Sequence, residues 1–171
     1  MIKLIDILFE AKQVGILYHF TSLNSLSSMI MMKNKVILSI EYASYAGDTY
    51  ISFTRNPRLG TLGKSKHETK ITLDGDKMSN KYKFEPHVHK RYSYDDRFAK
   101  YSKDYEAEER INASKYGNKI DITPYILKIE TITEEAIAKE YEGTKYAKMV
   151  LDDYDTIKTW CQKKNIPFSN F

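Results

Sequence analysis

Apolar and polar positions alternate with the period of a strand in some segments and repeat with the period of a helix in others. The chain is therefore predicted to contain both strands and helices. Residues 16–20 are apolar except for His19, a pattern typical of a buried strand. Thr21 or Ser22 can then serve as the N-cap of a helix, because apolar residues recur at helical spacing over residues 23–30. His19 is therefore expected on a strand that ends where a helix begins.

The same patterns predict the remaining elements. Further strands are expected at residues 36–40, 50–54, 70–73 and 125–129, and helices at residues 132–141 and 144–164. Small polar or Gly-bearing stretches predict loops at residues 41–49 and 60–63 and a turn at residues 74–76. Residues 81–105 are rich in Tyr, Phe, Lys and Arg but have little periodicity, which predicts an ordered, lid-like loop.

The last predicted helix is amphipathic and should bury one face. Its expected inner residues are Tyr146, Met149, Val150, Tyr154, Ile157 and Trp160. The helix should end before Pro167, since proline cannot continue it. Trp160 is accordingly expected in the core.

Length and composition predict one domain, and the mixture of predicted strands and helices predicts an α+β fold. A chain of 171 residues with 42% hydrophobic content is long enough for one ordinary core and short for two. The single cysteine, Cys161, excludes an internal disulfide and a thiolate metal cluster, so a reducing cytoplasm is expected. No apolar run approaches the length of a membrane span, so no membrane partner is expected. We expect a monomer.

The charge balance is mildly basic, with 27 Lys and Arg against 23 Asp and Glu and a formal net charge of +4. This balance is compatible with a polyanionic partner without requiring one. The chain also has 14 Tyr and 7 Phe, and aromatic rings among cations can stack on nucleic-acid bases. In the segment 81–105 such rings are interleaved with Lys and Arg, although packing of the Tyr rings on a small core is an equally common arrangement.

Residues 1–12 form a short amphipathic pattern with Asp6 interrupting its apolar run, which excludes a secretory signal. An ordinary N-terminal helix packed on the domain explains the pattern. The segment also resembles the capsid-targeting peptides of tailed-phage internal head proteins, because Leu8-Phe9-Glu10 matches their cleavage pattern. That resemblance implies cleavage after Glu10 and packaging in a phage head, with the remaining domain spanning residues 13–171.

The stretch from Asp104 to Ile111 concentrates carboxylates beside an arginine, and it is interpreted as an active-site strand. A solvated acidic patch on a helix is the alternative, since Glu and Ala favour helices and charge runs usually face water. If the stretch is a strand, side chains alternate between its faces, so Glu108 should point inward while Glu109 is exposed. Glu109 is then expected to be structural, pairing with a nearby cation.

Three segments in this order resemble the ADP-ribosyltransferase superfamily, most closely the DarT-type enzymes that attach ADP-ribose to DNA. The motifs are Tyr18-His19-Phe20-Thr21 with the helix after it, the strand at 51–57 that ends in Arg55-Asn56-Pro57, and Ala107-Glu108. The resemblance covers about residues 16–130 through short motifs only, and residues 60–104 match nothing. It implies two small packed antiparallel or mixed β-sheets flanked by helices, NAD+ as the ADP-ribose donor, and no metal.

The resemblance also implies roles for individual residues. Glu108 would stabilise the sugar cation formed when NAD+ loses nicotinamide, which resembles the oxocarbenium ion of glycoside hydrolysis. Tyr18, His19 and Thr21 would bind NAD+, with His19 on a ribose hydroxyl, although His19 could instead be a satisfied core histidine. Ser52 and Thr54 lie on the second strand, and whichever points inward could brace Glu108.

Arg55 would neutralise the pyrophosphate or assist transfer, because a planar cation with five donors suits phosphate oxygens. A surface arginine at a strand end is the alternative for this residue. Glu106 lies two residues before Glu108, and arginine-specific protein ADP-ribosyltransferases have such a Glu-any-Glu pair. Those enzymes normally have Arg where His19 stands, so the chain mixes two patterns.

The sequence thus favours a mono-ADP-ribosyltransferase with nucleic acid, single-stranded DNA or RNA, slightly preferred as acceptor over host protein. Protein arginine modification through Glu106 and Glu108 is one alternative. An NAD-dependent RNA 2′-phosphotransferase fits less well, since too few Arg and His residues are available for its phosphate. From a different class, the chain could be a noncatalytic nucleic-acid-binding or packaged head protein. His87 and His89 lack a third ligand, so no metal site is expected.

Overall fold

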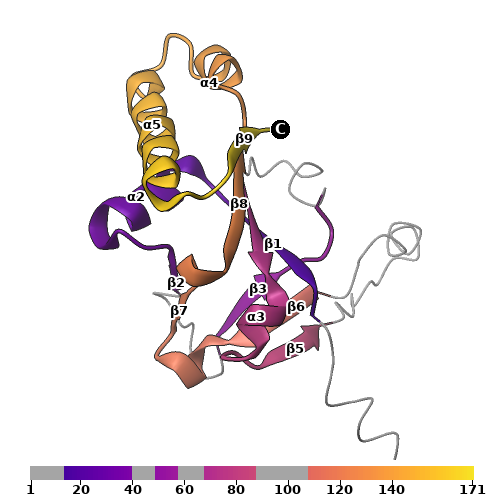
Figure 1. The fold of residues 1–171 in the computed structure, drawn as a ribbon. Coiled ribbons are helices and arrows are strands. Elements are labelled where there is room, and N and C mark those ends of the chain that lie inside the picture. Colours follow the sequence, from indigo (N-terminus) through magenta and orange to yellow (C-terminus); the bar gives the residue numbers. More distant parts are fainter. Residues whose placement is uncertain (1–13, 40–48, 58–67, 88–107) are drawn as a thin grey trace, which may run out of the picture.

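A computed structural model describes residues 14–39, 49–57, 68–87 and 108–171. Its strands and helices have an α+β arrangement, as predicted (Figure 1). In chain order the elements are β1 (Ile16–Thr21), α2 (Leu23–Lys33), β2 (Ile37–Ser39), β3 (Tyr50–Phe53), β4 (Thr69–Asp74), α3 (Gly75–Ser79), β5 (Phe84–His87), β6 (Glu108–Asn112), η3 (Ala113–Tyr116), β7 (Lys119–Asp121), η4 (Thr123–Tyr125), β8 (Ile126–Thr131), α4 (Glu134–Glu140), α5 (Ala147–Lys164) and β9 (Phe168–Asn170). The expected N-terminal segment 1–12 lies outside the described residues.

The largest sheet has the strand order β1-β4-β8-β9. Its first three strands pair antiparallel, and β9 adds parallel to β8 at the edge. In β4 the side chains alternate, with Thr69, Ile71 and Leu73 buried and the residues between them half-buried. This alternation gives the sheet one core face and one outer face.

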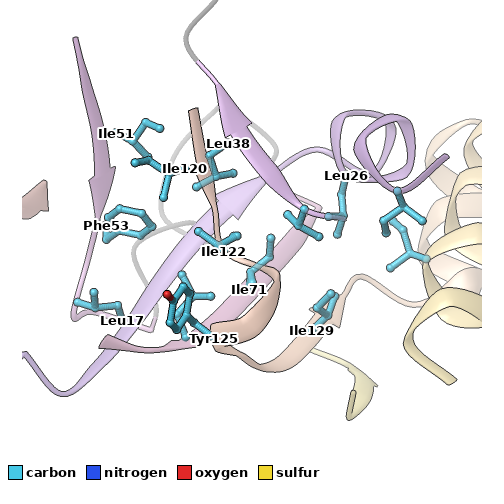
Figure 2. Close-up of a cluster of buried hydrophobic side chains, with 14 of the residues drawn as sticks. Leu17, Leu26, Leu38, Ile51, Phe53, Ile71, Ile120, Ile122, Tyr125 and Ile129 are labelled. Carbon is cyan, nitrogen blue, oxygen red and sulfur yellow. The ribbon is translucent and has the colours of Figure 1, made fainter. Parts of the chain in front are cut away.

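A three-stranded sheet with the order β3-β6-β5 lies beside the first, and β2 pairs with β7 as a separate two-stranded ribbon. Ile51 and Phe53 of β3 are buried, and Ile111 of β6 lies opposite Ile51 on the same face. Figure 2 shows side chains of both larger sheets and of the β7–η4 region meeting in one hydrophobic cluster. The core therefore joins the sheets.

Helices α2 and α5 pack against each other at one end of the molecule (Figure 1). Ser22 is the N-cap of α2, as its position in the sequence predicted, and its side chain accepts a hydrogen bond from the Ser25 N–H. In α5, Val150, Tyr154, Ile157 and Trp160 are buried as expected. The two most N-terminal residues of the predicted inner face, Tyr146 and Met149, are instead 48% and 46% exposed. They were assigned wrongly because the helix extends beyond the surface that it covers.

The N-terminus of α2 is also held by a residue distant in sequence. The buried carboxylate of Glu68 accepts the Leu23 N–H at 3.0 Å and the Tyr141 hydroxyl at 2.6 Å. A carboxylate at this position satisfies an unpaired backbone donor and complements the helix dipole. The hydrogen bond to Glu68, together with burial, raises the pKa of Tyr141 to about 12.

Four features of the sequence prediction need correction. The expected turn at residues 74–76 is the start of helix α3, which Asp74 caps by accepting the Lys77 N–H. The predicted loop at 81–105 contains strand β5, and its residues 88–105 lie outside the described part. The short strands β7 and β9 were not predicted. Each is three residues long, so tertiary pairing rather than local pattern defines it.

Candidate functional site

The three strands that contain the predicted site residues are consecutive neighbours. Strands β1 and β3 meet at one antiparallel bridge, where Tyr18 N–H donates to the Thr54 carbonyl at 2.8 Å and Thr54 N–H donates to the Tyr18 carbonyl at 3.0 Å. Strand β3 then pairs along its length with β6. The bridge lies at the junction of the two larger sheets (Figure 1), so the segments that contain His19, Arg55 and Glu108 converge there.

His19 is half-buried in β1 and oriented by the second strand. Its Nδ1 lies 3.3 Å from the Ser52 carbonyl oxygen, and its ring centroid lies 5.7 Å from that of Phe53. A carbonyl oxygen can only accept, so the contact is a hydrogen bond in the tautomer that has a proton on Nδ1. Tyr18 and Thr21, the other two residues expected to bind NAD+, are half-buried in the same strand.

Ser52 and Thr54 differ in burial. Ser52 is exposed, whereas Thr54 is 7% exposed and its Oγ1 accepts the Asn56 N–H at 3.0 Å. Of the two residues, Thr54 is therefore the one that points inward. Ser52 thus presents its hydroxyl to solvent, and Thr54 closes the turn after β3.

Arg55 follows the bridge and pairs with a buried glutamate. Its Nη2 lies 2.7 Å from Oε1 of Glu109, whose side chain is 2% exposed. The expectation that Glu109 is exposed is therefore wrong, and the reason is register. Glu109 lies opposite Phe53, so it belongs to the core face of the sheet, and Arg55 compensates the buried charge. The expected pairing of Glu109 with a nearby cation is confirmed.

Glu108 is the first residue of β6, and its partner across the sheet is His87 of β5. Residues 108–112 form a strand, so the alternative of a helical acidic patch is wrong for this part of the stretch. Glu109 lies on the core face, so the alternation of a strand would place position 108 on the opposite face, and the side chain of Glu108 itself lies outside the described part. The rest of the acidic stretch, Glu106 included, lies outside the described residues.

Sequence reasoning did not single out Arg110, although it lies on the face of β6 that also includes Ser52 across the strand pair. Its guanidinium carbon is 4.0 Å from the centroid of the Tyr50 ring, close enough for a cation–π contact. The signal available in the sequence was the spacing of two residues between Glu108 and Arg110, which places both on one strand face.

Within the residues that the structure describes, His, Cys, Asp and Glu side chains form no group of three or more suited to hold a metal ion. His87 is in β5, while His67 and His89 lie outside the described part. No described helix combines the length and hydrophobicity needed to cross a membrane.

Comparison with known proteins adds no further assignment. The sequence matches no protein-family model, and neither the curated proteins nor the solved structures contain a significant match to this chain.

Proposed function

We propose that this chain is a mono-ADP-ribosyltransferase that transfers ADP-ribose from NAD+ to a macromolecule, with nucleic acid as the preferred acceptor. The observation that supports it most is the adjacency of β1, β3 and β6 around the Tyr18–Thr54 bridge. Residues separated by about ninety positions in the sequence, His19 and Glu108, thereby lie on strands separated by only one other strand. The proposal needs this adjacency, because the three motifs must meet in one site.

In this proposal Glu108 stabilises the positive charge that develops on the nicotinamide ribose. Departure of nicotinamide leaves a sugar cation, and a fixed carboxylate placed where that charge develops lowers the barrier. A residue on a strand supported by a neighbour on each side, as β6 is by β3 and β5, is held more rigidly than a residue on a loop. Glu109 lies on the core face and forms an ion pair with Arg55, so its role in this proposal is structural.

His19 orients NAD+, the ADP-ribose donor. The hydrogen bond from Nδ1 to the Ser52 carbonyl orients the ring, and in the neutral tautomer with a proton on Nδ1 the other nitrogen, Nε2, is an acceptor that suits a ribose hydroxyl. Tyr18 and Thr21 flank it on the same strand. Arg55 then has a supporting role, since its contact with Glu109 ties the end of β3 to β6 and keeps the two strands in register.

Nucleic acid is the preferred acceptor because exposed lysines lie near the sheet that contains Glu108. Lys81, Lys83 and Lys115 are exposed near β5, and Lys115 approaches Glu85 of that strand at 3.5 Å. Lysines near a strand edge attract phosphate regardless of base sequence. The aromatic residues expected to stack on bases between 88 and 105 lie outside the described part, and so does Glu106, on which protein arginine modification depends.

The test is nicotinamide release from NAD+ by the full chain, with and without single-stranded DNA, RNA and host protein. Wild type should release nicotinamide, and Glu108→Gln should reduce kcat by about a hundredfold or more, the usual effect of removing a group that stabilises transition-state charge. Glu109→Gln is the matched control, one residue away on the opposite face, and should retain most of the activity of its folded fraction. A wild-type chain inactive with every acceptor would overturn the proposal.

A second experiment with labelled NAD+ identifies the class of macromolecule that accepts the ADP-ribose. Incubation with fractionated lysate, followed by separate nuclease and protease digestion, shows which enzyme removes the label. Loss of label with nuclease alone is expected. Loss with protease alone would replace nucleic acid by protein as the acceptor.

A further inference from the structure

The outer face of the β3-β6-β5 sheet contains an arginine, Arg110, for which the described residues provide no carboxylate partner. Arg110 of β6 lies opposite Ser52 of β3 and Glu85 of β5. The residues on either side of it in the chain, Glu109 and Ile111, are 2% and 0% exposed on the core face. Arg110 itself is half-buried, and Ser52 beside it is exposed, so this face of the sheet is open.

The two arginines that the structure describes differ in their contacts. Arg55 is neutralised by Glu109 at 2.7 Å. Arg110 forms no ion pair with a carboxylate among the described residues, and its buried Nε has no hydrogen-bond partner there. The carboxylate across from it, Glu85, is directed to Lys115 at 3.5 Å. Among the described residues, no ion pair therefore neutralises the positive charge of Arg110.

The Tyr50 ring holds this guanidinium in place. A Cζ-to-centroid distance of 4.0 Å places the guanidinium over the ring, a contact that fixes the side chain without occupying its N–H groups. An arginine held in this way presents a planar fork of donors that matches two oxygens of a phosphate. The exposed Ser52 hydroxyl, directly across the strand pair, can add a further hydrogen bond.

We propose that Arg110, held against Tyr50, binds the pyrophosphate of NAD+. This inference rests on the proposed transferase function and specifies how that enzyme would bind NAD+. It assigns to Arg110 the pyrophosphate contact that the sequence suggested for Arg55. Residues 108 and 110 share a strand face and are about 7 Å apart along β6. That spacing suits a carboxylate at the nicotinamide ribose and a cation at the phosphates attached to that ribose.

The first experiment measures binding without catalysis, by titration calorimetry of the full chain with ADP and with adenosine. Wild type should bind ADP more tightly than adenosine, and Arg110→Gln should weaken ADP binding about tenfold or more while leaving adenosine binding unchanged. Arg110→Lys keeps the charge but loses the planar fork, so an intermediate value is expected. Lys139→Gln, an exposed change on α4, should bind ADP as wild type does.

Thermal unfolding of each variant shows that it is folded before binding is compared. Equal ADP affinity in wild type and folded Arg110→Gln, or no binding of ADP by wild type, would overturn the proposal. A loss of affinity for a single-stranded oligonucleotide with unchanged ADP binding would also overturn it, since Arg110 would then bind phosphate of the acceptor.

Nicotinamide release separates this inference from the proposed function. Arg110→Gln should raise KM for NAD+ with little change in kcat, whereas Glu108→Gln should mainly lower kcat. If wild type releases no nicotinamide but binds ADP through Arg110, the transferase proposal fails and the phosphate site stands. If wild type is active and Arg110→Gln has an unchanged KM, the phosphate site fails and the transferase proposal stands.

Discussion

The guanidinium of Arg55 lies 2.7 Å from the carboxylate of Glu109, which is almost completely buried on the core face of β6. This contact joins the segment after β3 to the strand that contains Glu108. Glu109 is fixed inside the protein by this ion pair, and the next residue, Arg110, lies on the opposite face across from Ser52. By the same alternation, position 108 falls on the face of Arg110.

Removing the charge of Glu109 should destabilise the protein. Glu109→Gln keeps the shape of the side chain but loses a charge-assisted hydrogen bond at a buried position, so the free energy of unfolding should fall by about 1–3 kcal/mol. Urea denaturation followed by circular dichroism measures this. Glu142→Gln, at an exposed position, should change it by less than about 0.5 kcal/mol. Equal values for the two variants would mean that the Arg55–Glu109 pair contributes nothing to stability.

Adding one methyl group at Gly75 should strain the junction of α3 and β1. A Cβ there would clash with the Gly15 carbonyl oxygen and would lie 2.9 Å from the side chains of Val14 and Leu17. Backbone atoms cannot move aside cheaply, so Gly75→Ala should cost about 1–3 kcal/mol. The melting temperature, compared with that of the exposed variant Lys119→Ala, reports the cost. A Gly75→Ala protein with the same melting temperature as wild type would contradict the packing described for this junction.

The Ser22 cap should contribute measurably to α2. Its side chain accepts the Ser25 N–H at 3.2 Å, so Ser22→Ala should lower stability by about 1 kcal/mol, whereas Ser22→Asp should preserve most of it. Ser28→Ala is the matched control, since Ser28 is exposed inside the same helix, where alanine is the better helix former. The control should be neutral or slightly stabilising. If both alanine variants behave alike in denaturation, Ser22 does not act as a cap.

Stability should fall in alkaline solution partly through Tyr141. Its pKa is raised to about 12 in the folded chain, first by the hydrogen bond to Glu68 and then by burial, whereas an unfolded tyrosine titrates near 10. The folded state therefore retains a proton that the unfolded state loses. The contribution is complete below pH 10 and disappears as the pH rises toward 12.

The measurement for Tyr141 is the difference in unfolding free energy between wild type and Tyr141→Phe at several pH values. Other tyrosines and lysines titrate in this range, so the comparison with Phe isolates the one hydroxyl. The difference should be largest below pH 10 and shrink above it. A difference that stays constant up to pH 12 would show that Tyr141 does not donate to Glu68.

Local patterns predicted the elements whose burial follows from near neighbours in sequence. β1, α2, β4 and α5 were expected because their apolar residues repeat with the period of a strand or a helix, and the Ser22 cap followed from the residue type. The sequence alone also indicated an α+β fold. Short strands such as β7 and β9 could not be predicted in this way, because three residues contain too little periodicity to distinguish a strand from a loop.

By itself, then, the sequence determined the longer strands and helices and which residue types could perform chemistry. Only the tertiary structure decided which face each residue occupies. Register between β3 and β6 places Glu109 opposite Phe53 in the core and Arg110 opposite Ser52 on the open face. A shift of one residue would exchange these positions, and the pairing that prevents it joins strands more than fifty residues apart. No local pattern contains that information, because long-range contacts set the register.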